Sequence, residues 1–348
     1  MLVSHLPAAA GAIALPLARR GDFWGGVLEK LGLVAAGLVI FAAVVAVILF
    51  LADKAPRRGR DMIQLALFVG PALVILSIGL IYPAVRTAIT AFTNGRSGDR
   101  FEFVGLQNFV WMFTQPQILQ VIGNTMIWVL CVPLISTVVG LAYAIFIDKS
   151  RGEKVLKAIV FMPMAISFVG AGVIWTFMYQ YRAEGFEQIG LLNQILVWLG
   201  QEPQQFLVNS PLNTFFLIVV MIWIQTGFAM VLLSAAIKGI PIELIEAARL
   251  DGANPWQQFR SVTLPGIRGT LVVVVTTISI ATLKVFDIVR AMTGGNYGTS
   301  VIANEMYTQA FNQGQFGQGS ALALILFVLV LPIVIYNVRV LRKQREIR

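Results

Sequence analysis

The sequence predicts an all-α, polytopic membrane protein, a bundle of about seven transmembrane helices. Hydrophobic residues make up 57% of its 348 residues and charged residues only 12%, whereas a soluble domain carries roughly 25% charged residues. The mean hydropathy is +0.80. Apolar runs of about 20 residues, the length that spans a bilayer as a helix, recur along the chain. With so few charges, most of the surface must face lipid.

Seven segments are long and apolar enough to cross a membrane. No long polar stretch between them could hold a soluble domain. We therefore predict one membrane domain, residues 62–348, preceded by a lead-in and an extra helix in residues 1–61. The segments are Leu31–Ala52, Met62–Ile81 (which could continue to Phe92), Ile118–Ile147, Val155–Tyr179, Leu212–Ala236, Thr270–Val289 and Ser320–Val340.

Basic residues gather in alternate connections between these segments. Loop 291–319 has none and loop 181–211 has one, whereas clusters occupy residues 54–60, 149–157, 238–268 and 339–348. Cytoplasmic loops carry the excess of Lys and Arg. This places the rich loops and the C-terminus in the cytoplasm and, after seven crossings, the N-terminus outside. Arg19, Arg20 and Lys30 argue only against the external placement of the N-terminus, because basic residues favour the cytoplasmic side.

Composition also excludes several functions. The net charge of +9 does not indicate nucleic acid, because the Lys and Arg residues flank apolar runs as membrane anchors do. Cys131 and His5 are the only residues of their types, so neither a disulfide framework nor a metal site is predicted. An intramembrane enzyme needs a nucleophile–base pair or a metal cluster, and no acidic pair lies within a span.

Residues 241–265, between the fifth and sixth segments, read as two short helices joined by a turn. Pro241 suits the first helical position, and Glu243 and Glu246 stand near the positive end of the helix dipole. Gly252, directly after Asp251, can take the positive φ that ends a helix.

The second short helix begins at Pro255, with Asn254 as its cap, and we expect Leu264 and Pro265 to stop it. In the first helix, Ala247 and Ala248 leave a face of small side chains that another surface can approach closely. The segment is thus predicted to be a compact knob beside the membrane.

The spacing within this knob resembles a known motif. Glu246-Ala247-Ala248, then three residues, Gly252, nine residues, Val262, one residue and Leu264-Pro265 is similar to the EAA loop of permeases in binding-protein-dependent ABC importers. Only Val262 departs, where the family usually has isoleucine. Resemblance extends over residues 62–340, and the runs 161–175 and 223–241 are similar to alpha-glucoside permeases of the maltose-permease-like family.

The resemblance implies a type I ABC importer core of six helices plus one N-terminal helix, in the bacterial inner membrane. It implies alternating access that carries a sugar, such as an alpha-glucoside, into the cytoplasm. The residues expected to couple transport to the ATPase are Glu243, Glu246, Ala247, Ala248, Asp251, Gly252, Leu264 and Pro265. The loop Thr93–Pro116 is too short for the large external domain of some maltose permeases.

The expected partners follow from the same resemblance. They are two ABC ATPase subunits, a second permease subunit or a second copy of this chain, and an extracellular or periplasmic solute-binding protein. The sequence has no Gly-x-x-x-x-Gly-Lys-[Ser/Thr] phosphate-binding loop. The chain is therefore expected to be no enzyme and to hold no cofactor, with ATP and Mg bound by the partner ATPases.

Another interpretation of the knob is an amphipathic helix lying on the bilayer surface. Such helices are usually strongly basic on one face. This segment instead carries Glu243, Glu246 and Asp251 against Arg249, which favours the coupling loop.

Polar groups within the fifth segment are candidates for sugar contact, since buried polar groups in membranes tend to mark pathways. Gln225 lies mid-segment near Trp223 and Phe228, and an amide beside aromatic rings suits sugar hydroxyls and C–H faces. Ile224, Gln225 and Phe228 also fall where related maltose permeases contact sugar. Gln225 could instead bond a neighbouring helix.

The sixth segment offers Thr282, Lys284 and Asp287. Thr282 matches a sugar-contacting position of the family but could bond its own helix backbone. Lys284 and Asp287, three residues apart on one predicted helix, form either a pathway site or a neutralised structural pair. Asn124, in the third segment, is interpreted as a helix–helix contact.

The competing class is an ion-driven secondary transporter or channel. Such proteins usually show intramembrane acidic relays or paired broken helices in two halves. Here Asp287 is the only candidate for such a relay, and no internal repeat is visible. Transport with and without an ATPase partner separates the two classes.

Overall fold

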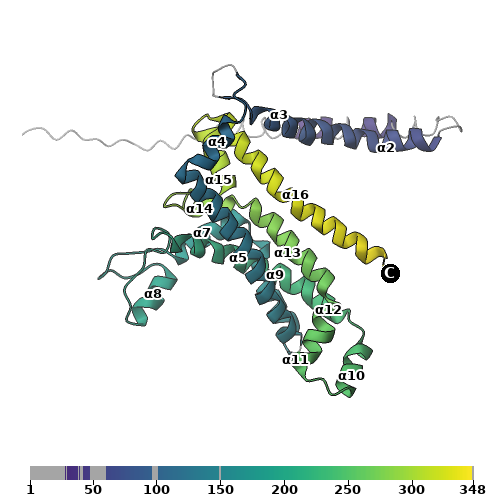
Figure 1. The fold of residues 1–348 in the computed structure, drawn as a ribbon, viewed down its shortest axis with the longest axis vertical. Coiled ribbons are helices and arrows are strands. Elements are labelled where there is room, and N and C mark those ends of the chain that lie inside the picture. The colour runs from purple at the N-terminus through teal and green to yellow at the C-terminus, as the bar shows by residue number, and fades with distance from the viewer. Residues whose placement is uncertain are drawn as a thin grey trace, which may run out of the picture. The chain divides into compact units, whose positions relative to one another are not determined.

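The computed structural model describes residues 28, 30–37, 39, 42–47, 60–95, 101–148 and 150–346, without the side chains of 60–64, 66 and 341–346 (Figure 1). These residues form helices joined by turns, with one isolated bridge between Thr93 and Phe103. The predicted all-α class is confirmed. The predicted lead-in with His5, and the basic residues 54–58, fall outside the described residues.

The chain divides into two compact units, residues 1–83 and 84–348. The described part of Lys30–Val47 is helical, and α2 (Arg60–Leu76) continues through a π-helical turn (Ser77–Ile81) into α3 (Tyr82–Thr90), whose first two residues belong to the first unit and whose remainder belongs to the second. Lys30–Val47 and Leu67–Thr90 are apolar enough to span a membrane, and none of their described residues is buried. The predicted continuation of the second segment beyond Ile81 is confirmed.

The core of the second unit is α9 (Leu212–Lys238). It packs along α5 (Pro116–Ile147) and against α13 (Arg268–Leu283), and α16 (Phe316–Glu346) lies along α13 (Figure 1). Buried residues make up 61% of the apolar window of α9 but 17% of that of α16. We conclude that α9 is the central helix, whereas most of the surface of α16 is not buried within the unit.

Glycines allow close helix contacts in this unit. A Cβ at Gly140 of α5 would lie 2.6 Å from the Cβ of Ala229, and one at Gly227 of α9 would lie 2.6 Å from the carbonyl oxygen of Val160. Small residues at such positions let helix backbones approach in a membrane, where van der Waals packing drives helix association. Both faces of α9 are thus closely packed.

The fourth predicted span is bent rather than straight. It consists of α6 (Glu153–Phe161), a 3₁₀ turn (Met162–Ala165) and α7 (Phe168–Met178), with a bend of 102°. Pro163 interrupts the helix, and the Ser167 hydroxyl accepts a hydrogen bond of 3.1 Å from Gly170 N to start α7. By length and composition, five of the described helices qualify as spans, or seven if each of two bent pairs counts as one.

The predicted continuous helix Thr270–Val289 is wrong, because α13 ends at Leu283 and a new helix, α14 (Asp287–Met292), begins four residues later. Ile288 and Val289 of α14 are fully buried, and α14 packs against α7. Gly172 of α7 allows this approach, since a Cβ there would be 3.0 Å from that of Ala291. Tertiary packing therefore overrides helix continuation.

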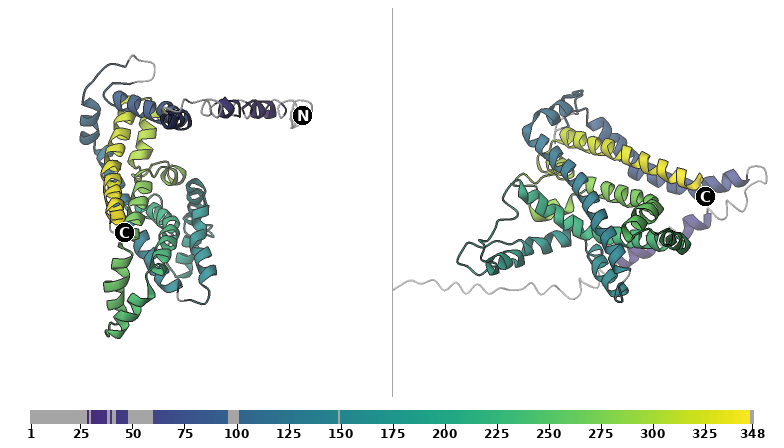
Figure 2. Two further views of the ribbon diagram at one scale, coloured as in Figure 1. Left: turned by 90° about the vertical axis from the view of Figure 1, so that its right-hand side faces the viewer. Right: turned by 60° about the horizontal axis from the view of Figure 1, so that its bottom comes forward.

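The remaining helices of the second unit are short (Figure 2). They join the long helices through loops and two further π-helical turns, Phe259–Thr263 and Thr308–Asn312. They are α4 (Gln107–Thr114), α8 (Leu191–Trp198), α10 (Ile242–Leu250), α11 (Pro255–Gln258), α12 (Leu264–Gly266) and α15 (Ile302–Tyr307).

Candidate functional site

The knob predicted between the fifth and sixth segments is a helical hairpin, residues 241–266, formed by α10, α11, a π-helical turn (Phe259–Thr263) and α12. It projects from one end of the second unit (Figure 1). Pro241 is the N-cap of α10 rather than its first helical residue, with φ −55° and ψ 131°. Its extended ψ explains the shift, because helical hydrogen bonding starts only at Ile242.

The turn of the hairpin is built on Gly252. Its φ is +81°, as predicted for the residue that ends the first helix. Gly252 N donates to Arg249 O and Ala253 N donates to Ala248 O, both at 3.0 Å, which is the hydrogen-bond pattern of a Schellman motif. A Cβ at Gly252 would meet no atom within 4 Å. The backbone conformation alone therefore requires glycine here.

The second arm of the hairpin starts as predicted. Asn254 Oδ1 accepts from Gln257 N at 2.9 Å, and Gln257 Oε1 accepts from Asn254 N at 2.8 Å, with Pro255 at the first helical position. This reciprocal pair is a capping box. The two arms of the hairpin are thus both fixed by local hydrogen bonds where they meet at the turn.

The second arm ends one residue beyond the Leu264-Pro265 pair that was expected to stop it. The helical backbone passes through the π turn and ends at Gly266, and the chain then bends by 68° into α13. The π turn ends at Thr263, two residues before Pro265, and such wide turns accommodate residues that disturb the regular hydrogen-bond ladder. Ile267, fully buried, anchors the bend.

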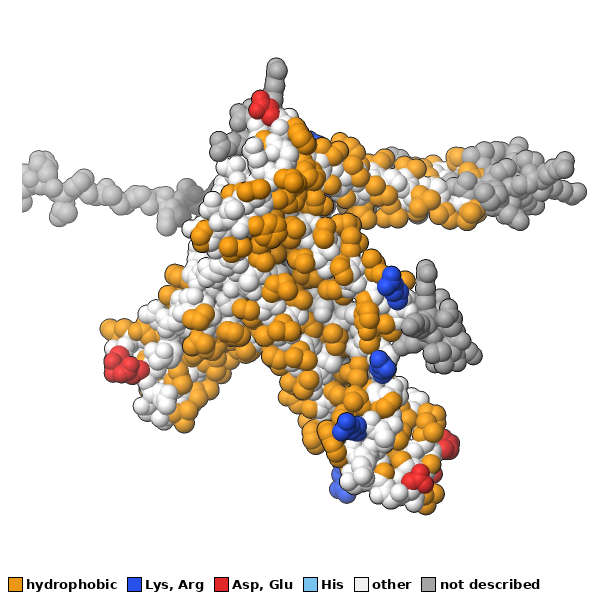
Figure 3. All heavy atoms as spheres, viewed as in Figure 1, with side chains coloured by type: hydrophobic (Ala, Val, Ile, Leu, Met, Phe, Trp, Pro, Cys, Tyr) orange, Lys and Arg blue, Asp and Glu red, His pale blue; other side chains and the backbone are white. Residues whose placement is uncertain are grey.

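The hairpin exposes an unpartnered surface of apolar and acidic side chains. No residue of α10 or α11 is buried, and Leu250 and Trp256 are 89% and 65% exposed. Glu243, Glu246 and Asp251 form no ion pair with any described residue. Figure 3 shows acidic side chains at this tip and basic ones just above it. Exposed apolar patches with a polar rim mark interaction sites.

A pocket of about 570 Å³ opens beside the turn, lined by Asp251, Gly252, Ala253, Gln257, Arg260 and Ser261. Sequence reasoning did not single out Leu250 and Trp256, although both flank the turn. The sequence does contain a signal for them, because large apolar side chains are unusual in a short connection exposed to water.

The candidate sugar contacts on α9 lie within the core of the second unit. Ile224 and Gln225 are buried, whereas Trp223 and Phe228 are partly buried. The Trp223 ring meets that of Trp175 edge-on, with centroids 5.7 Å apart. The Gln225 amide makes no hydrogen bond to any residue that the structure describes, so the alternative bond to a neighbouring helix is not seen.

The candidates of the sixth segment do not form one group. Thr282 Oγ1 donates to Ile278 O of its own helix at 2.7 Å and is fully buried, as in the structural alternative. Lys284 is exposed just past the end of α13, and Asp287 begins α14. The proposed i, i+3 pair needs one continuous helix, and no ion pair joins these two described residues.

Asn124 bonds a loop rather than a second helix. Its Nδ2 donates to Gly298 O at 2.6 Å and to Ser300 O at 2.9 Å, and Asn213 Nδ2 donates to Tyr297 O at 2.8 Å. Tyr297 has a φ of 56° and an exposed side chain. Buried amides thus fix the connection between α14 and α15, which sequence reasoning did not single out.

Comparison with known proteins identifies relatives over most of the chain. Residues 136–346 match the family described as "Binding-protein-dependent transport system inner membrane component". The chain is 51% identical over 282 residues to the osmoprotective compounds uptake permease protein GgtC of Synechocystis sp., covering 81% of this chain and 100% of that one. It is 52% identical over 283 residues to the alpha-glucoside transport system permease protein AglF of Rhizobium meliloti, covering 81% and 83%.

A solved structure has the same fold. A chain of a bacterial ABC transporter involved in the import of the acidic polysaccharide alginate superposes with a TM-score of 0.70 at 24% identity, covering 83% of this chain and 99% of that one. At this level of identity the likeness concerns the fold. It confirms the predicted architecture of an ABC importer permease.

Proposed function

Because the chain belongs to the family of binding-protein-dependent transport system inner membrane components, we propose that it is the permease of an ATP-driven importer of an alpha-glucoside or another small oligosaccharide. It is a multi-pass inner-membrane component rather than an enzyme. Two relatives of about equal similarity are named for osmoprotective compounds and for alpha-glucosides. The first name makes an osmoprotective compound the second candidate cargo.

One observation carries the coupling mechanism. The hairpin 241–266 is continuous at one end with α9 and at the other with α13, and α9 carries Gln225 at the core. A displacement of the hairpin therefore reaches both helices directly. Its apolar and acidic surface is free to bind a partner, and an ATPase whose cleft closes on ATP would supply the displacement.

Within this mechanism the residues of the hairpin have distinct roles. Glu246 pairs with a basic residue of the ATPase, and Glu243 and Asp251 add negative charge to the same contact. Ala247 and Ala248 allow close approach of the ATPase surface, and Gly252 sets the angle between the two arms. Leu264 and Pro265 lie where the second arm meets the bend into α13 and transmit its rotation.

The proposed complex contains two ATPase subunits, which bind ATP and Mg, and a second permease or a second copy of this chain. A solute-binding protein delivers the sugar from outside. The hairpin and the C-terminus are cytoplasmic and the N-terminus is outside, in keeping with the basic clusters of the alternate loops. Alternating access follows when the ATPases close and the spans rotate.

ATP-dependent uptake of sugar tests this function. In proteoliposomes with the ATPases, the companion permease and the binding protein, labelled alpha-glucoside should accumulate only with ATP. Uptake driven by an ion gradient without ATPase would instead support a secondary transporter and overturn the proposal.

We propose Gln225 as a sugar contact, because this residue is 8% exposed within the helix core, its amide forms no hydrogen bond with a described residue, and aromatic Trp223 and Phe228 are nearby in the sequence, with Ile224 beside it. Gln225→Ala should raise the KM for sugar about tenfold, as expected when one or two hydrogen bonds of about 1 kcal/mol each are lost. The measurement is initial uptake rate against sugar concentration.

Thr226→Val is the matched control on the same helix. Thr226 is 5% exposed, but its Oγ1 donates to Ile222 O at 2.7 Å, so its hydroxyl is already used and the KM should hold. Equal KM values for both variants would remove Gln225 from the sugar pathway. Thr282→Val should behave like Thr226→Val, because its hydroxyl is also used by its own helix.

A further inference from the structure

Four charged side chains from three helices meet near the root of the hairpin. Asp148 caps the C-terminal end of α5, Glu153 and Lys157 lie in the first turns of α6, and Lys238 is the last residue of α9. Two charges are positive and two are negative, so the cluster is neutral as a whole. Sequence reasoning read these lysines only as topology signals.

The contacts within the cluster are continuous. Lys157 Nζ pairs with Asp148 Oδ1, and lies 2.8 Å from Glu153 Oε1. Lys238 Nζ pairs with Glu153 and lies 3.9 Å from Asp148 Oδ1. Every member therefore contacts two others, and the cluster joins the ends of α5, α6 and α9.

Ser234 of α9 completes the arrangement. This serine is 2% exposed, and its Oγ lies 2.8 and 2.9 Å from the two carboxylate oxygens of Asp148 and also contacts Lys157 Nζ. The hydroxyl thus holds Asp148 to α9 directly, in addition to the longer contact with Lys238. A charged group bonded from three sides has a defined position.

The inner pair of the cluster is shielded from water. The side chains of Asp148 and Lys157 are 11% and 21% exposed, whereas that of Lys238 is 51% exposed. Partly buried ion pairs are screened less than surface pairs. Removal of one partner also leaves the other charge uncompensated. Asp148 and Lys157 should therefore carry most of the connection.

We infer that Asp148, Glu153, Lys157 and Lys238 form an ionic clasp that makes α5, α6 and α9 move together when the hairpin moves. The inference rests on the proposed function of the hairpin. Lys238 is separated from α10 by three residues, Gly239, Ile240 and Pro241. Without the clasp, a displacement of the hairpin can be absorbed by opening the last turn of α9, since helix ends are regions of low local stability.

Asp148 and Lys157 are thus positioning residues, and the readout is the number of ATP molecules hydrolysed per sugar imported. In the reconstituted complex, Asp148→Asn and Lys157→Met should each raise this ratio about threefold or more, within the range of coupling changes that single mutations cause. Co-purification of the ATPase subunits should be unchanged. Lys157→Arg, which keeps the charge, should restore the ratio.

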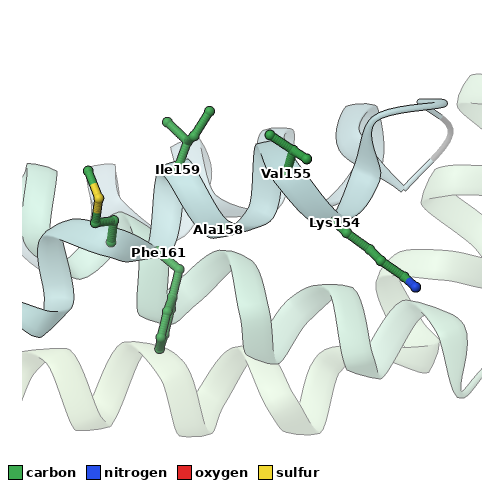
Figure 4. Close-up of a pocket in the computed structure, with 6 residues that line it drawn as sticks. Lys154, Val155, Ala158, Ile159 and Phe161 are labelled. Atoms are coloured by element: carbon green, nitrogen blue, oxygen red, sulfur yellow. The ribbon is translucent and has the colours of Figure 1, made fainter.

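Lys154→Met is the matched control, because it removes the same charge from the same helix. Lys154 has no ion pair with a described residue. It lines an apolar pocket of about 550 Å³ on α6 with Val155, Ala158, Ile159, Phe161 and Met162 (Figure 4). The Lys154→Met variant should hydrolyse as many ATP molecules per imported sugar as the unaltered chain. Lys238→Met, at the exposed edge of the cluster, should raise the ratio less than Lys157→Met and serves if the inner variants do not fold.

An unchanged ratio in Asp148→Asn, Lys157→Met and Lys238→Met would overturn the inference, whether uptake and hydrolysis stay normal or fall together. A parallel fall of uptake and hydrolysis would show that the cluster has a purely structural role. A complex of the unaltered chain that hydrolyses ATP without importing sugar would instead overturn the proposed function. The two failures are therefore distinguishable in one series of assays.

Discussion

Replacement of Gly252 by valine should reduce sugar uptake about tenfold by weakening the coupling between ATPase and spans. The φ of Gly252 is +81°, and a residue with a Cβ pays about 1–2 kcal/mol in this left-handed region. No neighbouring atom lies within 4 Å of the added Cβ. The variant should therefore change only the angle between the arms, while membrane insertion stays intact. Uptake and ATP hydrolysis in proteoliposomes measure the effect.

Gly200→Val is the matched control for this experiment. Gly200 has a φ of +74° and also has open space around its Cβ position, but it lies after α8 rather than in the hairpin. It imposes the same backbone strain elsewhere in the unit. Normal uptake in Gly252→Val, or an equal loss in both variants, would refute the role assigned to this turn.

Replacement of Gly140 by valine should prevent stable packing of α5 on α9. The added Cβ would lie 2.6 Å from Ala229 Cβ and 2.9 Å from Met230 N. The backbone of α9 cannot move away easily, because Gly227 places its other side against Val160. Overpacking of a closely packed core typically costs about 1–3 kcal/mol, and a clash with a backbone atom falls at the upper end of this range. In detergent, the purified variant should contain little monodisperse protein. Its thermal unfolding should have a lower midpoint temperature than that of the unaltered protein.

Gly123→Val, on the same helix, controls for the helix propensity of valine and for the loss of glycine. A Cβ at Gly123 would meet nothing within 4 Å, so its unfolding midpoint should remain close to that of the unaltered protein. Equal destabilisation of the two variants would show that contact with α9 is not the reason.

Local signals in the sequence predicted the parts of the fold that local chemistry decides. The long apolar runs predicted α5 and α9 to within two residues at each end. The turn at Gly252 and the cap at Asn254 were predicted because a positive φ and a capping side chain depend only on neighbouring residues. Most of the candidate hairpin could therefore be predicted from neighbouring residues alone.

Features that depend on distant contacts were not predictable in this way. Pro163 marks a possible interruption, but the 102° bend after it follows from packing of α7 against α14. The break after Leu283 contains neither glycine nor proline, and it arises because Ile288 and Val289 are buried. The meeting of Asp148 with Lys157 and Lys238 joins residues up to 90 positions apart. A sequence alone does not specify such pairs.

The claim that the hairpin 241–266 binds the ATPase is tested most directly by cysteine cross-linking of the hairpin to the ATPase subunit. With Cys131, the only native cysteine, replaced by serine, a cysteine is placed at exposed Ala247 and the assembled complex is treated with a short bifunctional reagent. We predict an adduct with the ATPase subunit whose yield changes on addition of ATP. Labelling of Ala247→Cys only by a lipid-phase reagent, with no ATPase adduct in any nucleotide state, would contradict the account.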